Sequence, residues 1–180
     1  SRCPSTVHGM SYDQIRDNWK DTESCHTITA KRRFDCTVTA IDISPQAMAY
    51  GSKVGLFDKT FVADLNGCGA SARAEVESAM TAADIFICAA ALVYLDLDAI
   101  DQLVAAFAAT DKEGYAMVNF LSFFAAEKTD ETKKILLKHL DFVGSTASRH
   151  RRMSPLEQSN YPGEEWVLLE VWVLKRKASP

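Results

Sequence analysis

A strand, a helix and a second strand follow one another within residues 38–66, and this alternation constrains the fold most. The first strand, CTVTAID, is apolar and β-branched. Ser44 and Pro45 then supply a helix N-cap and a proline at the first helical position. Gly55 suits the end of that helix, and KTFVADL predicts the second strand. This order is typical of two parallel strands joined by a helix.

The rest of the chain continues the alternation. Apolar Ile100, Leu103, Val104 and Phe107 recur at helical spacing on one face. The elements expected after residue 70 are a helix over 71–82, a buried strand within 83–95 that runs into a turn, a helix over 97–110, a strand over 115–123, a helix over 131–140, and strands over 141–152 and 164–177. The pattern predicts an α/β fold with a mostly parallel sheet between two helical layers and an antiparallel C-terminal hairpin.

Length and charge favour one ordinary globular domain. The chain has 180 residues, with 20 basic and 24 acidic side chains, for a net charge of −4. This balance gives no global field for nucleic acid. Residues 1–35 are polar and weakly periodic, with a short helix expected from Ser11 to about Trp19. We therefore predict an N-terminal polar or helical segment over residues 1–35 and an α/β domain over residues 36–180.

The cysteines and the hydropathy pattern favour a cytoplasmic protein. An odd number of cysteines without a C-x-x-C pair is typical of reduced thiols. The five are Cys3, Cys25, Cys36, Cys68 and Cys88. Neither a signal-peptide pattern nor an apolar run of about 18 residues is present, so no membrane partner is expected.

Several common chemistries leave no trace in the sequence. The four histidines show no H-x-x-x-H or H-E-x-x-H spacing, so no metal site is expected. The nucleophile elbow G-x-S-x-G and the phosphate loop G-x-x-x-x-G-K-[ST] are also missing. No dinucleotide fingerprint precedes Asp42.

Carboxylates end both strands of the opening segment, Asp42 the first and Asp64 the second. In open α/β sheets, ligands bind beyond the carboxyl ends of the strands. A carboxylate there can accept both ribose hydroxyls, and a polar residue after the next strand can accept from an adenine amine. The pair therefore suits a nucleoside, although aspartate is also common at strand ends for structural reasons.

With AIDIS, VADLN, ADIFICAAALVYL and YAMVNFL in this order before a closing hairpin, the chain resembles the class I, Rossmann-like S-adenosylmethionine-dependent methyltransferases over residues 36–176. The resemblance implies S-adenosylmethionine as cofactor and methyl transfer to a small-molecule acceptor. It implies a ribose contact at Asp42 and adenine contacts at the residues around it and after the next strand. The cofactor contacts so implied are Asp42, Ile43, Asp64, Leu65, Ala89 and Ala90.

The same resemblance places substrate contacts near the ends of the later strands. It implies Tyr94 and His150 as substrate contacts, with Glu127 as a further candidate. No catalytic residue is assigned, because the cofactor carries the reactive group and catalysis can rest on alignment.

The glycine-rich turn of that family, of the type D/E-x-G-x-G-x-G, is missing. Upstream of residue 38 the only glycine is Gly9. We therefore expect the family's first strand to lie outside this chain. Three outcomes stay open for the gap: a second copy or a partner chain completes the sheet, residues 22–34 supply a substitute strand, or the chain is poorly soluble. The alternative function is that of a non-catalytic subunit or scaffold with the methyltransferase fold.

Another segment, DLNGCGAS at residues 64–71, resembles the glycine-rich turn superficially. It would make Asp96 the ribose acceptor. This alternative lacks the third glycine and leaves too few strands downstream, so Gly67 and Gly69 are expected to form an ordinary loop.

One dense basic cluster ends the strand predicted over residues 141–152. Its members are Arg149, His150, Arg151 and Arg152. Two interpretations stay open: a site for an acidic substrate or nucleic acid, or a solvated strand end.

Overall fold

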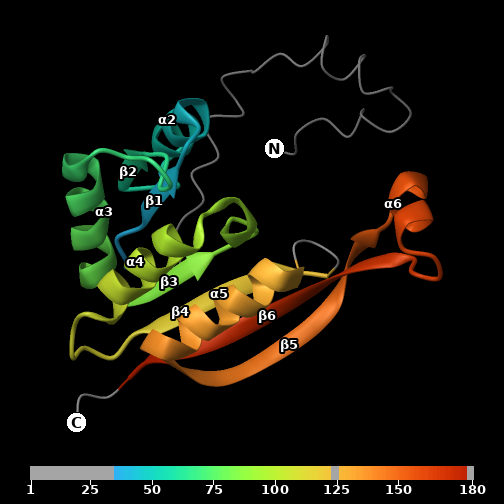
Figure 1. Ribbon diagram of the computed structural model, residues 1–180. Coiled ribbons are helices and arrows are strands. Elements are labelled where there is room, and N and C mark those ends of the chain that lie inside the picture. Colours follow the sequence, from blue (N-terminus) through green and yellow to red (C-terminus); the bar gives the residue numbers. More distant parts are fainter. Residues whose placement is uncertain (1–34, 123–125, 178–180) are drawn as a thin grey trace. The chain divides into compact units, whose positions relative to one another are not determined.

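The chain divides into two compact units, the first ending at Val62 and the second beginning at Ala63 (Figure 1). The computed structural model describes residues 35–122 and 126–177. The helix predicted near residues 11–19 lies outside the described residues.

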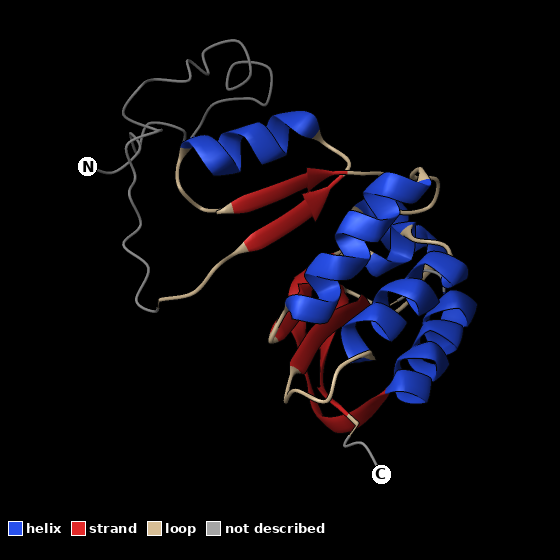
Figure 2. Cartoon of the chain, turned by 90° about the vertical axis from the view of Figure 1, so that its left-hand side faces the viewer, coloured by secondary structure: helices blue, strands red, loops and turns tan. Residues whose placement is uncertain are grey.

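The first unit contains a parallel strand pair covered by one helix, as the opening segment predicts (Figure 2). Strand β1 (Thr39–Asp42) pairs with β2 (Lys59–Val62), and helix α2 (Pro45–Lys53) connects them. The Ser44 hydroxyl caps α2 by accepting the Ala47 N–H at 3.2 Å. Just beyond the helix end, Gly55 takes a φ of +73°, a conformation that favours glycine.

The second unit contains a four-stranded sheet in the order β3-β4-β6-β5. Its elements are α3 (Ala70–Ala82), β3 (Ile85–Cys88), the 3-10 helix η2 (Leu92–Tyr94), α4 (Leu97–Ala108), β4 (Tyr115–Leu121), α5 (Ala126–His139), β5 (Leu140–Arg152), α6 (Pro155–Asn160) and β6 (Trp166–Arg176). Strands β3 and β4 are parallel, and β6 is antiparallel to both β4 and β5. The predicted C-terminal hairpin is thereby confirmed.

The core of the second unit lies between the sheet and α4 and α5 (Figure 2). The four apolar residues predicted for one face of α4 are all buried. Phe107 packs its ring 5.8 Å from that of Phe86 on β3. Complete burial of an aromatic or aliphatic side chain contributes about 1.5–3 kcal/mol, so this face of α4 stabilises the unit substantially.

Strand β3 does not have the continuous burial that its sequence predicts. Ile85 and Ile87 are 61% and 62% exposed, whereas Cys88 is buried and Phe86 is half-buried. Alternate side chains of a strand point to opposite faces, and α4 and α5 cover only one of them. Within the second unit, β3 also pairs with β4 alone, which leaves its other edge open.

The paired strands β5 and β6 form a ribbon that continues past β4 (Figure 1). Strand β4 ends at Leu121, opposite Leu169, and the ribbon extends to the pair of Arg152 and Trp166. Helix α6 follows β5. The sequence analysis missed α6, although Ser154 and Glu157 form a reciprocal capping box at its start.

One buried arginine, Arg176, ends β6 and forms hydrogen bonds with several elements. We call this end of the β5–β6 ribbon its base. The Arg176 guanidinium donates to the carbonyls of Phe107 at 2.6 Å and Ala83 at 2.7 Å. It also stacks on the Phe107 ring at 4.1 Å. Burial lowers the pKa of Arg176 from its usual value. Since α3 and α4 end at these carbonyls, the side chain satisfies helix-end acceptors that would otherwise lack donors.

Candidate functional site

Asp42 ends β1 with its carboxylate engaged in a local turn. One carboxylate oxygen, Oδ1, accepts the Ser44 N–H at 2.7 Å, and Ser44 in turn caps α2. The neighbouring Ile43 is 65% exposed. The turn fixes the carboxylate at the carboxyl end of the strand, where the sequence analysis predicts it. Asp42 and Ile43 belong to the first unit, and the other predicted site residues belong to the second.

Asp64 and Leu65 lie on the loop that opens the second unit. Asp64 Oδ1 accepts the Asn66 N–H at 3.1 Å. Leu65 is half-buried, and its carbonyl accepts from the Arg73 guanidinium at 3.4 Å. The loop is therefore held by local hydrogen bonds, with the Asp64 side chain exposed.

Asn66 ties this loop to the loop that follows β3. Its Nδ2 donates to the Tyr94 carbonyl at 2.9 Å, and its Oδ1 accepts the Asp96 N–H at 2.8 Å. Asp64 and Leu65 are thereby brought together with the segment that contains Ala89, Ala90 and Tyr94. Asn66 was not predicted from the sequence as a site residue. Its position directly after the predicted strand KTFVADL and before a glycine is the signal that was available.

Ala90 takes an unusual backbone conformation at the carboxyl end of β3. Its φ is +56°, which costs an L-residue about 1–2 kcal/mol. The Ala90 N–H donates to Asn119 Oδ1 on β4 at 2.6 Å, and this bond holds the strained residue in place. Ala89 and Ala90 are both exposed, at the edge where ligands bind in such sheets.

The end of this loop is anchored by α5 and presents an aromatic side chain. Lys128 Nζ donates to the Val93 carbonyl at 2.9 Å. Tyr94 is 77% exposed, so its ring is available to a ligand. Glu127, in the first turn of α5, is exposed as well.

The buried thiol at the end of β3 is unsuited to nucleophilic chemistry. Burial raises the pKa of Cys88 to about 11, and hydrogen bonds from the Ala91 and Leu92 backbone offset this only in part. A thiol with such a pKa is almost entirely protonated near neutral pH. We therefore assign Cys88 to the core.

His150 lies on a different element, the ribbon. It is exposed and coincides with a break in the pairing of β5 with β6 between Arg149 and Arg151. No hydrogen bond joins it to the loops of Asn66 and Ala90 within the described residues. The structure therefore groups Asp64, Leu65, Ala89, Ala90 and Tyr94 on linked loops and leaves His150 apart from them.

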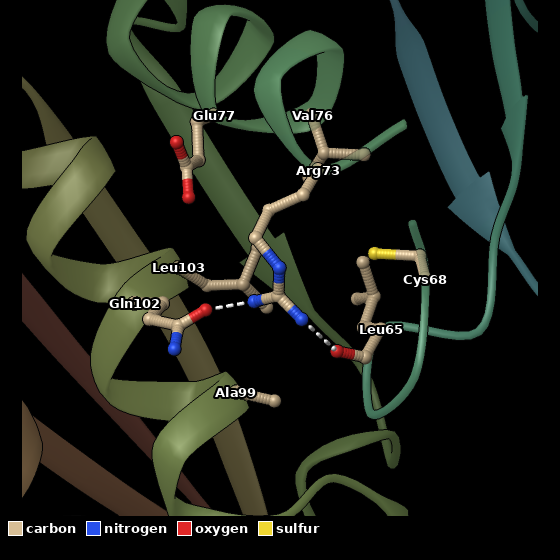
Figure 3. A pocket seen from close by; sticks show the side chains of 8 residues that line it. All are labelled: Leu65, Cys68, Arg73, Val76, Glu77, Ala99, Gln102 and Leu103. Atoms are coloured by element: carbon tan, nitrogen blue, oxygen red, sulfur yellow. Dashed lines mark hydrogen bonds between the residues drawn. The ribbon is translucent and has the colours of Figure 1, made fainter. Parts of the chain in front are cut away.

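A small hollow lies between α3 and α4 (Figure 3). Arg73 spans it, donating to the Gln102 carboxamide and to the Leu65 carbonyl. The remaining space is about 10 Å³, enough for about one water molecule. This hollow is too small for a cofactor and is part of the packing behind the Asp64 loop.

Gly67 and Gly69, in the segment DLNGCGAS, lie in an ordinary loop before α3, as expected. Gly67 and Gly69 do not take positive φ values, and Asp96 is the N-cap of α4 rather than the end of a strand. Over residues 35–122 and 126–177, no group of three or more His, Cys, Asp or Glu side chains is arranged to hold a metal ion. No helix within those residues is both long enough and apolar enough to cross a membrane.

Solved structures with a similar fold are methyltransferases. The N-methyltransferase NodS from Bradyrhizobium japonicum WM9, in complex with S-adenosyl-L-homocysteine, aligns with a TM-score of 0.51 at 14% identity, over 78% of this chain and 66% of NodS. The chain has the fold of a class I methyltransferase. A TehB-like SAM-dependent methyltransferase from Corynebacterium glutamicum aligns at 15% identity with a TM-score of 0.48, over 78% of this chain and 68% of its own.

The chain spans slightly less than two thirds of the NodS length. No family model matches the sequence, and no curated protein matches it. The likeness to NodS therefore concerns the fold. The family's first strand, expected from the sequence to lie outside this chain, stays a prediction.

Proposed function

We propose that this protein binds S-adenosylmethionine and transfers its methyl group to a small-molecule acceptor. The observation that carries the proposal is the pair of linked loops at the carboxyl ends of the strands, in a chain with the class I methyltransferase fold. Loops at this edge are the common ligand site of open α/β sheets. NodS, which shares the fold, was solved with S-adenosyl-L-homocysteine.

We assign roles to the site residues from the resemblance. Asp42 accepts the ribose hydroxyls, and Ile43 packs by the adenine. Asp64 and Leu65 contact the adenine edge. The loop at Ala89 and Ala90 faces the methionine part of the cofactor.

The chain's contribution to methyl transfer is alignment. When bound, S-adenosylmethionine supplies an activated methyl group on a sulfonium. The protein has to hold an acceptor in line with it, and proximity of this kind lowers a barrier by about 7–11 kcal/mol in well-oriented systems. The strained Ala90, fixed by Asn119, is suited to such positioning because it cannot relax without breaking the 2.6 Å hydrogen bond.

The direct test is a calorimetric titration of the 180-residue chain with S-adenosylmethionine and S-adenosylhomocysteine. We expect micromolar binding that Asp42→Ala weakens at least tenfold, about 1.4 kcal/mol. Asp42→Asn keeps an oxygen for the Ser44 N–H and should weaken binding less. Asp35→Ala, which removes an exposed carboxylate before β1, is the matched control. Binding that is undetectable, or unchanged in Asp42→Ala, would contradict the proposal.

A second candidate is a non-catalytic subunit that pairs with another chain. The observation that favours it is the open edge of β3, with Ile85 and Ile87 exposed beside it. Open apolar strands are prone to association. Sedimentation at increasing concentration, with and without Ile87→Lys, tests this function. Association that Ile87→Lys abolishes, in a chain that does not bind S-adenosylhomocysteine, would favour the subunit over the enzyme.

A further inference from the structure

Two arginines near the far end of the ribbon share one aromatic ring. The guanidinium carbons of Arg149 and Arg152 each lie 5.1 Å from the centroid of the Trp166 ring. Their charges are therefore within about 10 Å of each other. Both side chains are exposed.

An irregularity in the strand produces this arrangement. Residues three apart on a regular strand point to opposite faces, so Arg149 and Arg152 would be separated. The register shift at His150 inserts one extra residue, with Arg149 opposite Leu168 and Arg152 opposite Trp166. A bulge of this kind re-aims side chains and is common next to functional sites.

The two guanidiniums keep their donors available. A cation–π contact uses the charge of a guanidinium and not its N–H donors, which stay available to a carboxylate or phosphate. No carboxylate within the described residues pairs with Arg149 or Arg152. Their neighbour Arg151 differs, since it forms two hydrogen bonds with Glu157, at 2.6 and 2.8 Å. A bound anion would be attracted by both positive charges.

The pair lies next to the carboxyl end of a central strand. Leu168, which pairs with Arg149, exchanges hydrogen bonds of 2.8 and 2.9 Å with Ser122, directly after β4. This is the edge of the sheet at which the acceptor of a transferred group would be expected.

We infer that Arg149 and Arg152, held on the Trp166 ring, bind the acidic group of the methyl acceptor, a carboxylate or a phosphate on a small molecule. The inference rests on the proposed function. A small acid fits better than a nucleic acid, because the patch is confined to one end of the ribbon in a chain with a net charge of −4. Each guanidinium can bind a carboxylate or a phosphate through two parallel N–H donors.

The test follows the indole N–H signal of Trp166 by NMR while the full chain is titrated with inorganic phosphate and, separately, with benzoate. We expect saturable shifts in at least one titration, and the tighter anion identifies the acidic group. Arg149→Gln and Arg152→Gln should each weaken binding about tenfold. Arg151→Gln is the matched control, since it removes the same charge from the same strand, and should change binding less than twofold.

The inference is overturned by no saturation with either anion, by equal weakening in Arg151→Gln, or by tighter binding of a single-stranded oligonucleotide that displaces the anion. S-adenosylhomocysteine titrations of the same samples separate the two proposals. Cofactor binding without anion binding refutes the arginine site alone. Anion binding without cofactor binding refutes the proposed methyl transfer and the acceptor role with it. A tenfold loss of cofactor affinity in Arg149→Gln would assign the pair to the cofactor instead.

Discussion

The two ends of the β5–β6 ribbon hold arginines in opposite conditions. At its base, Arg176 is buried and donates to several backbone carbonyls. Near the other end, Arg149 and Arg152 are exposed, stack on Trp166 and pair with no carboxylate of the described residues. A guanidinium whose donors are mostly used by backbone carbonyls stabilises the fold, whereas one whose side chain is exposed is available to a ligand. The same residue type therefore has a structural role at one end and, we propose, a binding role at the other.

Substitution of Arg176 should produce the largest effect on stability. Arg176→Met leaves the carbonyls of Phe107 and Ala83 buried without their donor, and each such group costs about 1–3 kcal/mol. We expect a loss of about 3 kcal/mol or more in the free energy of unfolding, measured by urea denaturation. Lys177→Met removes an exposed side chain that donates to the carbonyls of Leu137 and Lys138, and should cost only about 1 kcal/mol because water can replace its hydrogen bonds. Equal losses in the two variants would contradict a special role for Arg176.

Gly114→Ala should disturb the same arginine without removing it. A Cβ at Gly114 would lie 2.6 Å from Arg176 Nη1, so the guanidinium would have to shift. Overpacking of this kind costs about 1–3 kcal/mol. Gly69→Ala, where a Cβ meets nothing within 4 Å, is the control for urea denaturation. A Gly114→Ala protein as stable as Gly69→Ala would show that the guanidinium has room to move.

Neutralising Arg149 or Arg152 should change the free energy of unfolding only slightly. Arg149→Gln or Arg152→Gln removes one cation–π contact, worth about 0.5–1 kcal/mol at an exposed site. We expect a decrease in unfolding free energy of that size or less, well below that of Arg176→Met. A loss of 3 kcal/mol would mean that this end of the ribbon depends on the pair structurally, and the comparison between the two ends would fail.

The ion pair of Arg151 with Glu157 makes a contribution to stability that depends on pH. The Arg151 guanidinium, with hydrogen bonds from Ser154, lowers the pKa of Glu157 to about 2. A depressed folded pKa means that the contact stabilises α6 fully above the ordinary glutamate pKa and is lost as the pH falls toward 2. The Ser154 amide signal, followed by NMR from pH 6 to pH 2, should therefore titrate near 2. A midpoint near 4.5, or an unchanged profile in Glu157→Gln, would contradict this.

The sequence predicted most of the elements because their signals are local. Proline after Ser44, the apolar spacing of α4 and the β-branched runs determine helix or strand within a few residues. The burial of β3 was wrong, because which face a helix covers depends on the sheet around it. Helix α6 was missed although its capping box is local, since a six-residue helix has too few positions to show a period.

The candidate site could be predicted only in part. The strand pattern predicted Asp64, because ligand edges follow from strand direction, and the resemblance to the methyltransferases implied Ala89 and Ala90. Asn66 and Asn119 act on residues 28 and 29 positions away, and no local pattern reveals such pairs. The bulge at His150 likewise depends on the pairing of β5 with β6. The contact of Arg149 and Arg152 with one tryptophan ring could therefore not be predicted from the sequence RHRR.

The most direct test of the methyltransferase assignment is an amide NMR spectrum of the labelled chain recorded with increasing S-adenosylhomocysteine. We expect saturable shifts at Asp42, at Asn66 and at Ala90, with the Arg176 amide unchanged. Shifts that are missing, or that are confined to residues outside the strand-end loops, would contradict cofactor binding by this fold.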